Sequence, residues 1–250
     1  MAENKAVKLV IYPYEKRSYQ APSGNKIVTV YAGTLYVVNG HQEIIDIAAG
    51  PIPGKTYDDN GGHTAESTHE GIYVLDRGES HTTASWPASV VPWGTPVREL
   101  NGIIQYQIGN QWRDASGPRG TVTQAVQLFY ARTPNTHKTP QQIQDDVRDI
   151  FTDWKTGRIT QVYRANDFGK LSWNLKRNGK RTGFYIHTTP VDEFNTANGG
   201  NVMLLQSHGC IHIRPVDRDR LMKAGYLREG VTVEVKKYGE VGPPPGFFFQ

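Results

Sequence analysis

Residues 27–47, IVTVYAGTLYVVNGHQEIIDI, are the stretch that best predicts the fold class. β-branched and aromatic residues dominate them, and two such runs flank Asn39-Gly40. Asn-Gly is preferred in two-residue hairpin turns because both residues adopt positive φ at little cost. We therefore predict strands at Ile27–Tyr31, Leu35–Val38 and Glu43–Ile47, with a tight turn at Asn39-Gly40.

Similar runs lie on both sides of this stretch. Upstream, Val7–Tyr12 forms a short strand that Pro13, and then Pro22-Ser23-Gly24-Asn25, interrupts. Downstream, β-type composition predicts strands at Gly71–Leu75, Ile103–Ile108, Ile159–Tyr163, Leu171–Leu175, Gly183–His187 and Val231–Val235. Shorter strands are expected near Trp86-Pro87 and Val90–Gly94, a turn at Gly109-Asn110, and a solvated hairpin tip at Lys176–Arg181.

Helical signals are confined to two segments. Thr139 is placed as an N-cap, Pro140 as the first helical residue and Gln142 as the partner in a capping box. This helix is expected to run to about Trp154 and to end by Gly157, with an apolar face made of Ile143, Val147, Ile150, Phe151 and Trp154. A second short helix is expected from Arg214-Pro215 to about Ala224, capped by Gly225. The predicted fold is therefore mainly β with one or two short helices.

A chain of 250 residues that is 37% hydrophobic can bury a substantial core. We expect one elaborated domain over residues 26–238, preceded by an N-terminal arm, 1–25, and followed by a Pro/Phe-rich tail, 239–250. The tail either is a disordered terminus or docks onto a partner. No internal repeat and no linker separates further domains.

Charge and cysteine content exclude several classes of function. The net charge is +4, the basic residues are scattered, and no groove-reading motif accompanies them, so we expect no nucleic-acid partner. The single cysteine excludes an internal disulfide. No apolar run reaches membrane-spanning length, and the first twenty residues do not form a cleavable signal peptide.

The only cysteine lies in Ser207-His208-Gly209-Cys210-Ile211, and a histidine ends the upstream strand Phe184-Tyr185-Ile186-His187. A thiol is nucleophilic as the thiolate, which a nearby base can generate. Gly209 allows close approach of a substrate, and its N–H or that of Cys210 can donate to a developing oxyanion. The alternative is a small, buried and inert thiol. His208, next to the nucleophile, orients neighbouring groups or takes the proton.

Together, Ile186-His187-Thr188 and Ser207-His208-Gly209-Cys210 resemble the signature of the L,D-transpeptidase (YkuD-domain) family. The hairpin, the Gly/Pro loop at Gly50–Gly54 and the strand at Gly71–Leu75 resemble that family's opening. The resemblance implies a β-sandwich-like catalytic fold and cysteine acyl transfer on peptidoglycan stem peptides, with no cofactor and no metal.

Carried over to this sequence, the family's pattern implies a role for each residue of the motif. Cys210 would be the nucleophile and His187 its base, oriented by the Thr188 carbonyl, while Gly209 and Cys210 would form the oxyanion hole. Ser207 and His208 would shape the pocket, together with Tyr185.

The sequence departs from the family's pattern in two places. The interval from Thr188 to Gln206 is long, which predicts an enlarged loop over the site, and His212 stands where Arg or Asn is common. Arg214 either supplies the charge for a substrate carboxylate or forms a surface ion pair.

Several alternatives follow for the function. The thioester on Cys210 is resolved by an amine, giving a cross-link or D-amino acid exchange, or by water, giving carboxypeptidase action. A substrate outside the cytoplasm and no evident signal predict a secreted antibacterial effector that acts in the periplasm or cell wall, with a cognate immunity protein as partner. A catalytically silent peptidoglycan-binding module and a cysteine protease of another fold are the rivals. A zinc site built from His63, His69 and His81 is a weaker alternative, because their spacing fits no compact ligand pattern.

Overall fold

The computed structural model describes residues 6–20, 27–39, 43–54, 65–133, 135–153, 155–205 and 207–242, and of residues 14–20 and 27–32 it describes the backbone alone. Some predicted features lie outside these residues: Gly40 of the turn, residues 22–25, the Gly61–His63 segment, Trp154, Gln206 and the tail from residue 243 onward. The described chain is mainly β.

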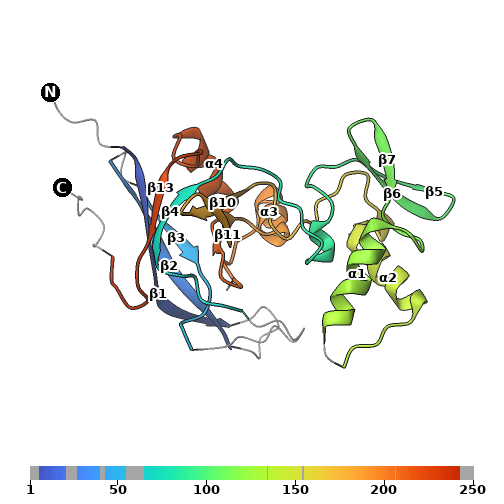
Figure 1. Cartoon of the computed structure of the whole chain (residues 1–250), viewed down its shortest axis with the longest axis horizontal. Helices are drawn as coiled ribbons and strands as arrows, with labels where there is room; N and C mark the ends of the chain where they lie inside the picture. Colours follow the sequence, from blue (N-terminus) through green and yellow to red (C-terminus); the bar gives the residue numbers. More distant parts are fainter. Residues whose placement is uncertain are drawn as a thin grey trace. The chain divides into compact units, whose positions relative to one another are not determined.

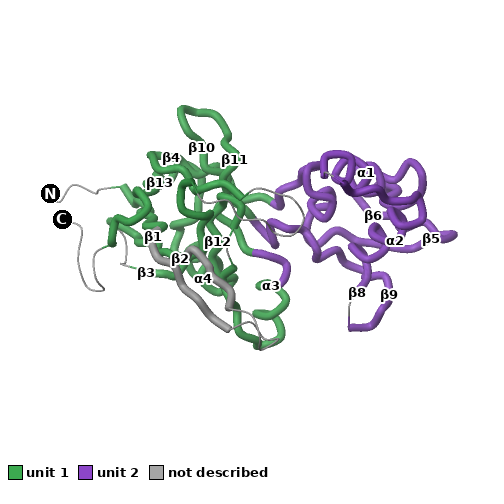
Figure 2. The backbone as a smooth tube through the Cα atoms, turned by 90° about the horizontal axis from the view of Figure 1, so that it is seen from below, with its two compact units in different colours: residues 1–79, 172–188, 192–250 green, residues 80–171, 189–191 purple. Residues whose placement is uncertain are grey.

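The chain divides into two compact units (Figure 2). Unit 1 comprises residues 1–79, 172–188 and 192–250, and unit 2 comprises residues 80–171 and 189–191. Unit 1 therefore contains every residue predicted for the cysteine site, and unit 2, which holds His81 of the zinc alternative, is made almost entirely of one continuous segment.

Unit 1 is built around a closed barrel with the strand order β1-β13-β4-β10-β11-β12-β3-β2 (Figure 1). A single sheet closes on itself, whereas the prediction was a sandwich-like arrangement. The strands are β1 (Lys8–Gln20), β2 (Ile27–Val38), β3 (Ile44–Ala48), β4 (Gly71–Leu75), β10 (Ser172–Arg177), β11 (Lys180–His187), β12 (Ile211–His212) and β13 (Thr232–Val235).

Alternation along the strands explains why these segments form a barrel. In β4 and β13 the burial of side chains alternates along the strand, so each of these two strands turns one row of apolar side chains inward. The buried residues include Leu9, Ile11, Leu35, Val37, Ile45, Ile47, Tyr73, Leu75, Trp173, Leu175, Ile186, Ile211, Val233 and Val235. This core holds β11 and β12, the two strands that carry the predicted site.

Two predictions about the first strands were wrong. β1 does not stop at Pro13 but continues to Gln20, because the register with β2 shifts between Tyr12 and Glu15 and so places the proline at an irregularity, where its missing N–H is tolerated. β2 is one continuous strand where two were expected. The turn prediction is supported at Asn39, which has φ +61°. β1 pairs with β2 and β13, so much of the predicted arm belongs to the barrel.

Unit 2 packs a three-stranded sheet and two helices around one core (Figure 1). Its core consists of Val91, Val97, Ile104, Tyr106, Ala115, Val122, Val126, Ile143, Val147, Phe151 and Tyr163. Its elements are a 3₁₀ helix (Pro87–Ser89), β5 (Val97–Leu100), β6 (Ile103–Ile108), β7 (Gln111–Asp114), α1 (Thr121–Arg132), α2 (Pro140–Phe151), β8 (Thr152–Asp153) and β9 (Arg158–Ile159).

The strand and turn predictions for unit 2 were correct in part. β6 and the turn at Gly109 are where they were expected. Trp86-Pro87 leads into the 3₁₀ helix and Val90–Gly94 is irregular, so neither forms a strand. Of the predicted strand Ile159–Tyr163, only Ile159 lies in β9, and Val162 makes an isolated bridge to Pro96.

The described chain contains four α-helices, more than the one or two that were predicted. α2 has the expected capping box, in which Thr139 and Gln142 each accept from the other's backbone N–H, but it ends at Phe151, before Gly157. α4 (Pro215–Lys223) is as expected, with Gly225 at φ +75° just after it. The unpredicted helices are α1, which has no side-chain cap, and α3 (Pro190–Ala197), inside the segment expected to be a loop.

Candidate active site

Strand β11 carries Tyr185 and His187 near its carboxyl end. It pairs antiparallel with β10 and parallel with β12, so neighbouring strands hold it on both sides. The register places His187 beside Ser172 on β10 and beside His212 on β12. His187 is buried, with 5% of its surface exposed, and Tyr185 is also buried, which raises its pKa.

One hydrogen bond fixes the tautomer of His187. Its Nδ1 lies 2.7 Å from the carbonyl O of Thr188. Because a carbonyl oxygen can only accept, Nδ1 carries a proton, and in the neutral ring Nε2 therefore has the lone pair. An imidazole in this state can take a proton at Nε2 and later return it. The contact is the one that the family resemblance implied for Thr188.

The thiol of Cys210 packs against the backbone of β11. Its Sγ lies 3.8 Å from the carbonyl O of Gly183, and the N–H of Tyr185 donates to the sulfur. The pKa of the Cys210 thiol is raised to about 12. Although the residue is half-buried by exposed area, the main cause is desolvation of the sulfur. The Tyr185 N–H lowers the pKa, and the charge of Glu66 raises it. The resting thiol is therefore neutral at pH 7, and the nucleophile requires a base.

Gly209 occupies a position that only glycine fills without strain. Its φ is +118°, and a Cβ would lie 2.9 Å from Cε1 of Phe184 and 3.0 Å from Cγ of Glu66. The hydroxyl of Thr68 donates to the carbonyl O of Gly209 at 2.8 Å. The loop before β4 thus fixes the backbone next to the thiol.

Ser207 ties the two ends of this turn together. Its Oγ donates to the carbonyl O of Cys210 and accepts from the N–H of Gly209 at 3.1 Å. The oxyanion role expected of the Gly209 N–H therefore requires Ser207 to release that group. Ser207 is almost fully buried, so it shapes the turn from within.

His212 contacts His187 through its ring. The two ring centroids are 4.6 Å apart in a T-shaped arrangement, and Nδ1 of His212 lies 3.0 Å from the carbonyl O of Leu205. The pKa of His212 is lowered to about 4, mainly by burial. The bond to Leu205 raises the pKa, and the charge of the half-buried His208 lowers it. His212 is therefore neutral at pH 7 and offers no charge for a substrate carboxylate.

Arg214 is shared between two carboxylates. Its guanidinium lies 3.1 Å from Oδ2 of Asp46 and 3.6 Å from Oδ2 of Asp217, at the start of α4. Of the two readings of this residue, the ion pair is the one observed. The structure thus joins His187 to Thr188 and His212, and it joins Ser207, Gly209 and Cys210 in one turn whose thiol packs against the strand of His187. It places Arg214 among acidic side chains.

Sequence reasoning missed the contacts made by Glu66 and Thr68 at the turn and by Glu193 and Arg218 behind Thr188. Glu193 accepts from Oγ1 of Thr188 at 2.6 Å and from the guanidinium of Arg218. Pro190 followed by Asp192 and Glu193 is a helix-start pattern that could have revealed α3. The contacts that bring residues 66–68 to the turn have no signature in the local sequence.

A cleft of about 860 Å³ opens in unit 1 beside this turn. Glu66 and Thr68 line it and also contact Gly209, and the ring of His69 lies 4.8 Å from that of Phe184. The other lining residues are Pro53, Gly54, Ser67, Glu70, Arg177, Lys237 and Tyr238. Its volume lies within the range of small-molecule and peptide sites.

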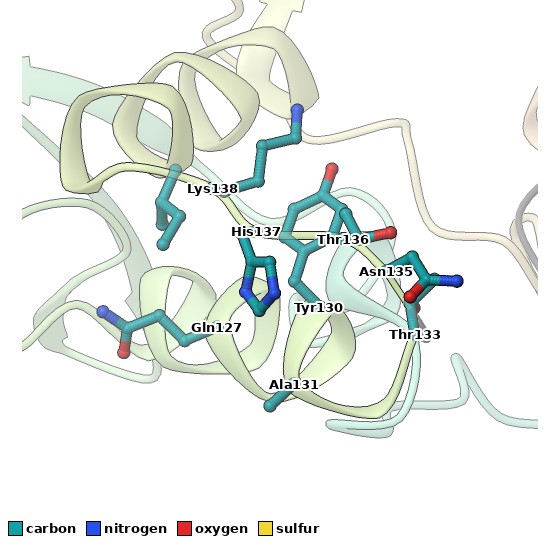
Figure 3. Close-up of a pocket in the computed structure, with 9 residues that line it drawn as sticks. Gln127, Tyr130, Ala131, Thr133, Asn135, Thr136, His137 and Lys138 are labelled. Carbon is teal, nitrogen blue, oxygen red and sulfur yellow. The ribbon is translucent and has the colours of Figure 1, made fainter.

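Unit 2 has a smaller pocket of about 460 Å³. Figure 3 shows its side chains coming from α1 and from the connection to α2. Its lysine is already paired: Lys138 lies 3.2 Å from Oδ2 of Asp146 and over the ring of Tyr130. Nothing in this pocket resembles a nucleophile with its base.

Within the described ranges, no three His, Cys, Asp or Glu side chains are grouped as metal ligands would be. His63 of the zinc alternative lies outside those ranges. Among the helices of the described chain, none has the length and apolarity that crossing a bilayer requires. The chain has no significant match among protein-family models, curated proteins or solved structures.

Proposed function

We propose that this protein is a cysteine acyl-transferase acting on peptidoglycan stem peptides. The observation that carries the proposal is that the thiol of Cys210 packs against the strand that ends in His187, whose Nδ1 is held by Thr188. The resemblance of both segments to the L,D-transpeptidase signature supports the substrate class. On this proposal, the barrel of unit 1 is a variant of that family's catalytic fold.

In the first half-reaction, Nε2 of His187 takes the proton of the Cys210 thiol while Sγ attacks the carbonyl carbon of a stem-peptide amide. A C–S bond forms and the carbonyl oxygen becomes an oxyanion. When the oxyanion collapses, the C–N bond breaks, His187 returns its proton to the leaving amine, and the terminal D-amino acid departs. The product is a thioester on Cys210.

In the second half-reaction, an amine or water attacks the thioester, and His187 again carries the proton. An amine gives a cross-link or an exchanged terminal residue, and water gives a shortened peptide. The thiol pKa of about 12 means that little thiolate exists before substrate binds, so proton transfer accompanies attack.

The cleft beside Gly209 is the proposed seat of the stem peptide. Glu66 and Thr68 belong both to the cleft lining and to the surroundings of Gly209, so a peptide bound there lies next to the nucleophile's turn. Its volume is sufficient for several amino-acid residues.

The test is mass spectrometry of purified disaccharide-tetrapeptide after incubation with wild type, Cys210→Ala and His187→Ala, with and without D-methionine. Dimers or D-methionine exchange that depend on both residues would establish a transpeptidase, and loss of the terminal residue alone would establish a carboxypeptidase. Unchanged muropeptides with all three proteins would refute acyl transfer on this substrate.

The second candidate is a catalytically silent peptidoglycan-binding module. The neutral thiol and the Gly209 N–H already bonded to Ser207 favour it. Such a module would bind peptidoglycan equally well as wild type and as Cys210→Ala, and would leave muropeptide composition unchanged.

A further inference from the structure

A line of polar contacts continues behind His187, away from the thiol. Thr188 is fully buried and makes two of these contacts: its carbonyl O accepts from Nδ1 of His187, and its Oγ1 donates to Oε1 of Glu193 at 2.6 Å. Glu193 lies in α3, inside the segment that sequence analysis predicted as a loop over the site.

The carboxylate of Glu193 is itself held from the other side. Arg218 of α4 donates to the same Oε1. The side chain of Glu193 is 10% exposed and that of Arg218 is 2% exposed. Arg218 also donates to Oδ1 of Asp219 at 2.8 Å. A buried ion pair persists only where hydrogen bonds satisfy both partners, so this carboxylate has one well-defined position.

This arrangement constrains the residue that orients the catalytic base. Thr188 is anchored at its hydroxyl, so rotation of its side chain or displacement of its Cα would break the bond to Glu193. With the Cα held in place, the carbonyl keeps the position from which it accepts from Nδ1 of His187. Because Arg218 compensates the charge of Glu193, the effect on His187 is one of geometry and tautomer rather than of charge.

We propose that Glu193, held by Arg218, is a positioning residue that fixes the orientation and tautomer of His187 through Thr188. The inference rests on the proposed function, in which His187 is the base for Cys210. It assigns a role to α3 and α4, which otherwise only flank the site.

The experiment follows the alkylation rate of Cys210 by iodoacetamide from pH 5 to pH 11, which needs no natural substrate. Wild type should show a neutral-pH limb, where His187 assists ionisation of the thiol, and an alkaline limb, where the thiol ionises alone. Only the neutral limb should depend on the position of His187, so the alkaline limb is an internal control.

Thr188→Val keeps the volume and removes the hydroxyl. It should lower the neutral limb about tenfold, the low end of the effect of partners that orient a functional histidine. Thr188→Ser should recover most of that loss. Thr34→Val is the matched control, because the hydroxyl of Thr34 is buried in unit 1 without a hydrogen-bond partner in the described chain, and it should leave both limbs unchanged.

The double variant Glu193→Leu with Arg218→Met removes both charges together and so avoids an unpaired buried charge. It should lower the neutral limb as much as Thr188→Val does. Adding Thr188→Val to the double variant should lower that limb little further, since both changes act on one line of contacts. The ¹⁵N shifts of His187 should show mixed tautomers in either variant.

Superimposable pH profiles for wild type and Thr188→Val, with both proteins folded by circular dichroism, would overturn the inference. A neutral limb that disappears in His187→Ala but survives in Thr188→Val would overturn it while leaving the Cys–His pair intact. A neutral limb unaffected by His187→Ala would overturn the proposed pair, and the inference with it.

Discussion

Replacing His212 with Asn should reduce the loss of stability that the wild-type protein shows when the pH falls from 6.5 to 4. Nδ1 of His212 lies 3.0 Å from the carbonyl O of Leu205, and its ring packs on that of His187. Asn retains an N–H donor near the position of Nδ1 but does not titrate. The variant therefore keeps the bond to Leu205 while removing the ionisable group.

The magnitude follows from the pKa of His212, which burial lowers from the ordinary value of 6.5 to about 4. Below pH 6.5 the unfolded chain binds a proton at this residue and the native chain does not, so stability is complete above pH 6.5 and falls as the pH drops toward 4. At about 1.4 kcal/mol per pH unit, the loss is about 3 kcal/mol. His187 and His208, which face or influence this ring, are present in both proteins.

The assay is urea unfolding of wild type and His212→Asn at several pH values between 4 and 7.5. The unfolding of unit 1 is monitored by pulsed amide hydrogen exchange on its peptides. The difference in free energy of unfolding between the two proteins should shrink by about 3 kcal/mol from pH 6.5 to pH 4. A difference that stays constant over this range would refute a buried, neutral His212. So would an imidazole signal of His212 that titrates near pH 6.5 in NMR spectra.

Three further perturbations test other parts of the structure. Gly209→Ala should lower muropeptide turnover at least tenfold and destabilise unit 1 by about 1–3 kcal/mol, because its φ and its Cβ contacts are both unfavourable; wild-type turnover would contradict this. Asp76→Asn should cost about 2 kcal/mol at pH 7, and this cost should disappear as the pH falls through 2, since the bonds of Asp76 to Lys176 and Arg181 hold its pKa at about 2; a pH-independent cost would contradict this. Tyr163→Phe should lower the stability of unit 2 by about 1–3 kcal/mol by leaving the Ala88 carbonyl without its donor, as differential hydrogen exchange would show; unchanged exchange would contradict this.

Elements with strong local signals were predictable. The capping box of α2 depends on residues three apart, and the Asn39 and Gly109 turns depend on φ values that those residue types favour. The tip at Asn178-Gly179 was also found, although the flanking Lys176 and Arg181 are paired with Asp76 rather than simply solvated. In each case a few neighbouring residues determine the conformation.

Elements that depend on tertiary contacts were not predictable. α1 begins at Thr121-Val122-Thr123, residues of modest helix propensity, and forms because Val122 and Val126 are buried in the core of unit 2. Closure of the barrel depends on the parallel pair of β1 with β13, more than two hundred residues apart. Neither feature is encoded in a local pattern.

The candidate site was predictable where the chemistry is local. The contact between His187 and Thr188 joins adjacent residues and is observed as expected, whereas the pair of Cys210 and His187 stays a prediction from two short segments. The contribution of Glu66 to the thiol's surroundings and of Glu193 to Thr188 depends on chain crossings that no spacing reveals.

The most direct test of the central claim is the intact mass of the protein during turnover of disaccharide-tetrapeptide. We predict a hydroxylamine-sensitive adduct on Cys210 whose mass equals the substrate without its terminal D-amino acid, absent in Cys210→Ala and strongly reduced in His187→Ala. Turnover of the muropeptide by Cys210→Ala, or turnover by wild type with no adduct on Cys210, would contradict a thioester mechanism.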